Sequence, residues 1–257
     1  MIRAYLTYLL KARDAHSLHS PFVFDLYTYL IRADNPDEPA FGPIRALQRE
    51  LLNDRRIIRI TDFGAGSRIN ASRERAIRDI AKNSQKPARF GRLLYRLIQR
   101  LDAKLILDLG TSLGITTLYE AAAAPQAQLL TFEGCPQTAA VASNNFQKLN
   151  RSNIEIITGN LDETLTDRLK TVERIDFAFF DANHRYEPTM RYFEIALSKI
   201  HNDSCFVFDD IHWSDEMEQA WEQIKAHPAV TVTIDLFYVG LVFFRSQQPK
   251  QDFILRF

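Results

Sequence analysis

Hydrophobic residues follow two different periods along the chain. As far as residue 101, apolar positions recur every three or four residues, within 2–12, 20–31, 42–54, 71–82 and 90–101, and this spacing predicts amphipathic helices. From Lys104 onward, short apolar runs end near residues 110, 133, 159, 182 and 210, and each is followed by a helical stretch. Such alternation is typical of βαβ units, which build a parallel sheet with helices on both faces.

The last two apolar runs break this alternation. Residues 230–237 and 241–245 both have the pattern of strands, but only Tyr238, Val239 and Gly240 separate them. Three residues are too few for a helical crossover, so the two strands should pair antiparallel. We therefore predict an α/β fold, a doubly wound seven-stranded mixed sheet whose last strand is antiparallel. A helical extension or lid over residues 1–85 would precede a ligand-binding domain over residues 86–257.

Two stretches have the composition of a glycine turn that leads into a helix. They are DFGAGS at 62–67 and DLGTSLG at 108–114. Only the second follows an uninterrupted apolar strand, and the next strand ends in Glu133, whose carboxylate could accept hydrogen bonds from both ribose hydroxyls of a nucleoside. Ligands bind at such turns in open α/β sheets, so 108–114 is the predicted cofactor turn. For residues 62–67, a simple turn with a helix cap and a substrate-side role both remain open.

The ordered stretches ILDLGTSLGITTLYEA, LLTFEGCP, TGNLDETL, IDFAFFDANHRYEP and FVFDDIHW resemble the motifs of class I S-adenosylmethionine-dependent methyltransferases. The similarity covers about residues 82–245 and is greatest to the catechol-O-methyltransferase-like O-methyltransferases. It implies that the protein is an enzyme that methylates an oxygen of a small molecule with S-adenosylmethionine, in a Rossmann-like domain. An RNA or protein methyltransferase on the same core is the alternative, because residues 45–104 contain many arginines.

The resemblance also assigns residues to the cofactor. It implies that Glu133 binds the ribose, that Gly159 and its neighbours border the adenine, and that Ser84 contacts the cofactor from a preceding turn. The complete set of implied cofactor residues is Ser84, Asp108, Gly110, Thr111, Ser112, Gly114, Thr116, Glu133, Gly134, Gly159, Asn160, Leu161 and Asp181.

Polar residues that could perform chemistry follow the fourth and fifth strands of the predicted sheet. In the metal-dependent members of the family, the positions of Asp181, Asp209 and Asp210 hold a divalent cation such as Mg²⁺, and a lysine base stands where this chain has His184. Three interpretations stay open: a cation site, a metal-free site with His184 or His212 as the general base, and histidines that only hydrogen-bond to loop backbone. Asp181, His184 and His212 are the predicted catalytic residues.

Composition adds limits on location and partners. The formal net charge is zero, so we do not expect a nucleic-acid partner. Only two cysteines, Cys135 and Cys205, are present, so we expect a cytoplasmic protein without disulfides. We also expect no membrane segment. The predicted partner is a small-molecule methyl acceptor, whose identity the sequence does not give, and a homodimer remains open. His16 and His19 lie at the start of a predicted helix, where capping and packing compete with a role near the substrate.

Overall fold

The structure is a computed structural model that describes residues 2–61 and 74–257, so the DFGAGS turn lies outside the described residues. Contacts between Cα atoms divide the chain into two compact units. The first joins residues 1–34 to residues 171–257, and the second contains residues 35–170. The predicted boundary between residues 85 and 86 remains a prediction.

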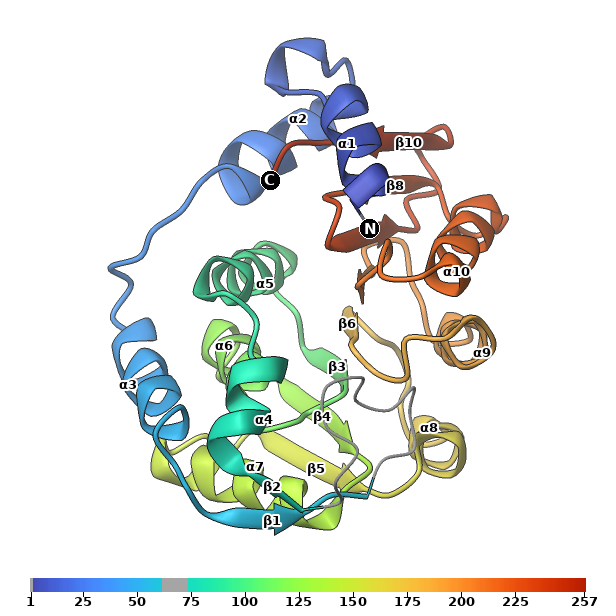
Figure 1. The fold of residues 1–257 in the computed structure, drawn as a ribbon. Helices are drawn as coiled ribbons and strands as arrows, with labels where there is room; N and C mark the ends of the chain where they lie inside the picture. The colour runs from blue at the N-terminus through green and yellow to red at the C-terminus, as the bar shows by residue number, and fades with distance from the viewer. Residues whose placement is uncertain (1, 62–73) are drawn as a thin grey trace. The chain divides into compact units, whose positions relative to one another are not determined.

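The second unit contains the first three strands of the βαβ pattern (Figure 1). Strands β3 (Leu105–Leu109), β4 (Gln128–Glu133) and β5 (Ile154–Thr158) pair in parallel in that order. Helix α6 (Ile115–Ala123) connects β3 to β4, and helix α7 (Pro136–Lys148) connects β4 to β5. Helix α8 (Leu161–Leu169) follows β5. The apolar runs are therefore strands and the amphipathic stretches between them are helices, as their periods predict.

Additional elements of the second unit precede β3. They are α3 (Phe41–Leu51), the antiparallel pair β1 (Ile57–Arg59) and β2 (Glu74–Ala76), α4 (Ile77–Ser84) and α5 (Ala88–Leu101). Helix α5 packs against α6, and Phe41 contacts the rings of Tyr95 and Tyr119 edge-on or tilted. The three aromatic side chains are buried, so α3, α5 and α6 share one apolar core.

The first unit contains the other five strands. Strands β6 (Phe177–Phe180) and β7 (Cys205–Asp209) are parallel, β9 (Val239–Phe243) runs antiparallel to β7, and β8 (Val232–Asp235) is antiparallel to β9. Strand β10 (Gln251–Ile254) then adds parallel to the outer edge of β8. Helices α9 (Tyr186–Leu197) and α10 (Asp215–Ala226) lie side by side (Figure 1).

The N-terminal segment of the first unit forms α1 (Ile2–Lys11), a 3₁₀ turn (Ala15–Ser17), α2 (Pro21–Leu26) and a π-helical turn (Tyr27–Ile31). The side chain of Ser20 accepts a hydrogen bond from the Val23 N–H and caps α2, and Pro21 occupies the first helical position. Arg13 forms a parallel bridge with Leu255, and the Tyr8 hydroxyl donates to the Leu255 carbonyl at 2.6 Å. These contacts join α1 to the strand β10.

The predicted fold class is confirmed, with one correction to the strand count. Among the residues that the structure describes, the mixed sheet has five strands in the first unit, in the order β10-β8-β9-β7-β6, and three in the second unit, in the order β3-β4-β5. The seven predicted strands are present, and the antiparallel pairing of the last two predicted strands is observed as β8 and β9. The additional strand is β10. Among the described residues, no helix combines the length and the apolar character needed to span a membrane.

Gly240 is required by close packing in the core of the first unit. A Cβ atom at this position would lie 2.5 Å from the buried ring of Trp221. We predict that Gly240→Ala lowers the free energy of unfolding by about 1–3 kcal/mol, because strand β9 or the ring must move to remove the overlap. Chemical denaturation followed by circular dichroism measures this change.

Gly42 provides the matched control. It lies in α3, and a Cβ atom there would meet nothing within 4 Å. Gly42→Ala should leave the stability unchanged or raise it by up to about 1 kcal/mol, because alanine favours helix. Equal effects of the two substitutions would contradict the steric role of Gly240.

Candidate active site

The glycine turn (residues 108–114) connects the end of β3 to the start of α6. Gly110, Ser112 and Gly114 all have positive φ angles, of 119°, 49° and 80°. The N–H groups of Gly110 and Thr111 donate to the carbonyl of Phe132 on β4, at 3.1 and 3.0 Å. A Cβ atom at Gly114 would overlap the ring of Phe146 on α7. The turn is therefore tied to β4 and packed closely against α7, and only glycine fits at Gly114.

Glu133, the last residue of β4, holds the middle of this turn. Its Oε2 atom accepts the Ser112 N–H at 2.8 Å, and its Oε1 atom accepts the Cys135 N–H at 2.9 Å. A carboxylate oxygen has two lone pairs and can accept more than one hydrogen bond, which is the chemistry needed to bind a ribose hydroxyl. The predicted ribose residue is thus fixed in orientation by two backbone groups.

Asp108 is fully buried, and its contacts include two threonine hydroxyls. Its Oδ2 atom accepts from Thr117 on α6 at 2.6 Å and from Thr131 on β4 at 2.8 Å. The hydroxyls of Thr131 and Thr111 lie 2.5 Å apart. Thr117 and Thr131 were not identified from the sequence as partners of Asp108. The predicted contact of Asp108 with the cofactor stays a prediction.

Other predicted cofactor residues lie in the same unit. The Ser84 hydroxyl is 3.0 Å from that of Ser112, and the Gly159 N–H donates to the Glu133 carbonyl at 3.0 Å. The side chain of Asn160 accepts the Asp162 N–H and caps α8. These contacts link the end of α4, the glycine turn and the β5–α8 connection. Thr116 lies in the first turn of α6, Gly134 follows β4, and Leu161 begins α8.

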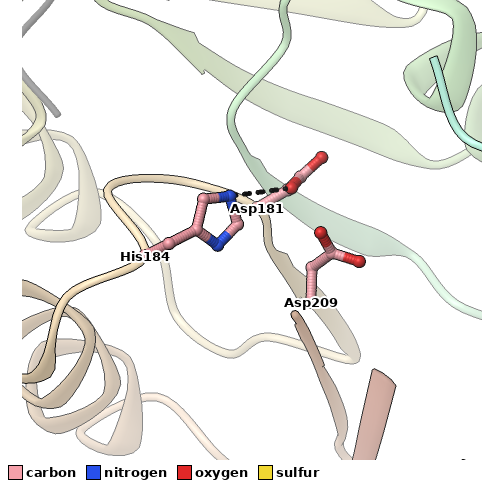
Figure 2. Close-up of side chains that lie close together, drawn as sticks. All are labelled: Asp181, His184 and Asp209. Carbon is pink, nitrogen blue, oxygen red and sulfur yellow. Dashed lines mark ion pairs between the residues drawn. The ribbon is translucent and has the colours of Figure 1, made fainter. Parts of the chain in front are cut away.

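Asp181, His184 and Asp209 form an acid–histidine cluster in the first unit (Figure 2). Asp209 ends β7, and Asp181 follows β6 directly. Because Phe180 is paired with Phe208 in the parallel register, the next residue of each strand reaches the same edge of the sheet. The loop after Asp181 then turns at Asn183 (φ 64°), and His184 Nε2 lies 3.4 Å from Asp181 Oδ1.

This cluster has the donor set and spacing of a divalent cation site. One ligand atom from each of the three side chains lies within 4.8 Å of the others. A cation with bonds of about 2.0–2.4 Å keeps its ligand atoms at most about 4–5 Å apart, so the three side chains fit such an ion with little movement. Of the three predicted metal ligands, Asp181 and Asp209 belong to the cluster. Asp210 lies outside it, with a left-handed backbone (φ 54°), and His184 takes the third place.

His212 lies between two carboxylates. Its Nε2 atom is 2.8 Å from Asp235 and its Nδ1 atom is 3.3 Å from Glu218, and its ring stacks on Phe237. Burial lowers the pKa of His212, but the hydrogen bonds and charges of Asp235 and Glu218 outweigh it and raise the pKa above 6.5. Ionised carboxylates only accept hydrogen bonds, so a doubly protonated ring satisfies both. The predicted catalytic role of His212 remains a prediction.

Comparisons with known proteins agree with this architecture. Residues 107–211, less than half of the chain, match a family described as methyltransferase domain. A catechol O-methyltransferase from Niastella koreensis is 33% identical over 124 residues, which are 47% of this chain and 55% of that protein. The chain thus spans about half the length of this curated relative.

Two solved structures share the fold. An O-methyltransferase from Bacillus cereus, determined with S-adenosylhomocysteine, has a TM-score of 0.55 and 22% identity over 63% of this chain and 83% of its own. The S-adenosylhomocysteine-bound methyltransferase PaMTH1 from Podospora anserina has a TM-score of 0.61 and 13% identity, over 89% and 97% of the two chains.

The sheet and its helices form the Rossmann-like α/β fold of these solved structures, and residues 107–211 are similar to a methyltransferase domain. The predicted resemblance to the catechol-O-methyltransferase-like O-methyltransferases is confirmed.

The environment of His212 predicts a pH dependence of stability. Folding raises the pKa of His212, so its contribution to stability is complete below the unfolded value of about 6.5 and disappears as the pH rises through the folded value. We expect the free energy of unfolding of the wild type to fall more steeply above about pH 6.5 than that of His212→Gln. Urea denaturation at a series of pH values measures both slopes. The exposed His19→Gln should behave as the wild type, and identical slopes for all three proteins would exclude this linkage.

Proposed function

We propose that the protein is an S-adenosylmethionine-dependent methyltransferase that transfers a methyl group to an oxygen atom of a small molecule. The observation that carries the proposal is the Glu133 carboxylate, which is held by the Ser112 and Cys135 N–H groups inside a domain that matches methyltransferases. A carboxylate fixed at the end of β4 is suited to recognise the two ribose hydroxyls of the cofactor. Gly110, Ser112 and Gly114 would then lie along its methionine portion.

The acid–histidine cluster supplies the second part of the proposed mechanism. Methyl transfer from a sulfonium is an in-line displacement, so the enzyme must orient the acceptor and remove the proton of its hydroxyl group. His184 would accept this proton at a ring nitrogen, and Asp181, 3.4 Å away, would orient the ring and stabilise its charged form. Alternatively, Asp181, His184 and Asp209 would hold a divalent cation, which would make a bound hydroxyl more acidic and leave His184 as a ligand and not as the base.

The chemistry of the acceptor follows from the relative that this chain resembles. A catechol O-methyltransferase acts on an aromatic ring with neighbouring hydroxyl groups, and we infer a hydroxylated aromatic acceptor for this chain as well. Two adjacent oxygens would suit a cation held by two carboxylates and an imidazole. We also propose a cytoplasmic location, since Cys135 and Cys205 are buried free thiols.

Cofactor recognition by Glu133 can be tested without knowledge of the acceptor. We predict that the wild type binds S-adenosylhomocysteine and that Glu133→Gln binds it about 10- to 100-fold more weakly, because hydrogen bonds to a charged group contribute about 1.5–3 kcal/mol. Isothermal titration calorimetry measures both affinities.

Glu155→Gln is the matched control, because Glu155 is an exposed residue of the neighbouring strand β5 and pairs with Arg168. It should bind the cofactor product as the wild type does. Absence of binding by the wild type would overturn the proposed function. Equal affinity of the Glu133 and Glu155 variants would overturn the role of Glu133.

Removal of the proposed base should affect catalysis and leave cofactor binding unchanged. We predict that His184→Ala lowers the rate of methyl transfer to a catechol by about 10²–10⁴-fold, the usual contribution of general base catalysis. Its affinity for S-adenosylhomocysteine should equal that of the wild type. Radiolabelled methyl transfer measures the rate, and a wild-type rate in His184→Ala would contradict the assignment.

The same assay tests the proposed cation. Chelation should abolish the activity of the wild type, and added Mg²⁺ should restore it. Activity that is unaffected by chelation would leave His184 as a base in a metal-free site.

A further inference from the structure

A polar groove lies beside the N-terminal segment of the first unit, outside the acid–histidine cluster. Its volume is about 350 Å³, within the usual range for small-ligand sites. The side chains used in the argument are Asp14, His16, Thr28, Arg32 and Arg256, and Ala15 and Tyr27 complete the lining. The groove therefore combines residues from the two ends of the chain.

The backbone around this groove is well connected. Arg13 and Leu255 form a parallel bridge, and the Arg256 N–H donates to the Arg13 carbonyl at 3.1 Å. On the other side, the Arg32 N–H donates to the carbonyl of Tyr27 at 2.8 Å across five residues, which is a π-type bond. The segments that carry Arg256 and Arg32 are thus fixed by hydrogen bonds, so the groove requires little ordering when a ligand binds.

Thr28 is the least satisfied polar group of the lining. Its hydroxyl oxygen is buried, and the described part of the chain offers it no hydrogen-bond partner. A threonine hydroxyl in an α-helix commonly bonds to the carbonyl four residues earlier, but Thr28 lies in the π-helical turn and does not do so. A buried hydroxyl without a partner is unfavourable, and a ligand in the groove could supply the missing hydrogen bond.

The charge of the lining is positive. Arg32 and Arg256 are exposed, and neither guanidinium forms an ion pair with a residue in the ranges 2–61 and 74–257. The carboxylate of Asp14 accepts the His16 N–H at 3.2 Å and caps the 3₁₀ turn. Two arginines and one aspartate give the lining a net charge of +1 with His16 neutral.

We propose that this groove binds a small oxyanion, a phosphate or carboxylate group of a soluble metabolite. Guanidinium groups bind such planar or tetrahedral oxyanions through paired hydrogen bonds. The Thr28 hydroxyl would donate a further hydrogen bond to the same ligand. The proposal does not depend on methyl transfer, because no residue of the glycine turn or of the acid–histidine cluster lines the groove.

Titration with inorganic phosphate and with malonate, followed by calorimetry, tests this binding site and separates the two oxyanion sources. The wild type should bind one of the two anions, and the double variant Arg32→Gln/Arg256→Gln should bind it at least about tenfold more weakly. Lys11→Gln removes one positive charge from an exposed position outside the lining, and it should bind as the wild type. Failure of the wild type to bind either anion, or equal binding by the double variant, would overturn the proposal.

Thr28→Val tests the binding site independently, because this substitution does not change the net charge of the groove. Because the hydroxyl has no hydrogen-bond partner within residues 2–61 and 74–257, this nearly isosteric variant should be at least as stable as the wild type in thermal unfolding. Its affinity for the anion should fall by about 3- to 10-fold. An affinity equal to that of the wild type would contradict the role of Thr28 in the site.

Discussion

The hydrogen bonds from the Ser112 and Cys135 N–H groups to Glu133 are the contacts on which the proposed cofactor site depends. Ser112 has a positive φ angle in the middle of the glycine turn, and Cys135 precedes the first turn of α7. A single carboxylate therefore fixes the turn after β3 and the chain after β4. Without it, the N–H of Ser112 in the turn and that of Cys135 at the start of α7 would lack this acceptor.

Most of the fold could be predicted from the sequence. The spacing of apolar residues indicates which side chains are buried, and the layers of an α/β fold determine which faces of its helices and strands are buried. β6, β7 and β9 are buried at every position, and apolar residues occupy nearly all of these positions. The antiparallel pairing of β8 and β9 followed from the short connection alone. β10 could not be predicted in this way, because Gln251 and Asp252 are exposed and Phe253 and Ile254 are only partly buried. β10 pairs with the edge of β8, and the local sequence of β10 does not indicate this long-range contact.

Part of the candidate site was also accessible from the sequence. Carboxylates at strand ends were identified because parallel neighbouring strands bring their ends to one edge, and Asp181 and Asp209 are brought together in this way. Partners that are distant in sequence were not accessible. The contacts of Asp108 with Thr117 and Thr131, and those of His212 with Glu218 and Asp235, arise from tertiary packing. Asp210 shows that a position in the sequence is not sufficient to predict a contact, because it is adjacent to Asp209 and lies outside the cluster.

The acid–histidine cluster combines groups whose charges are interdependent. Two carboxylates with oxygens within 4.8 Å repel each other, so a nearby positive charge stabilises the pair. A divalent cation would provide that charge, with the His184 ring, 3.4 Å from Asp181, as its third ligand. A ring nitrogen that binds a cation has no lone pair left to accept a proton. The cation site and the metal-free site with His184 as the base are therefore alternative uses of the same three side chains.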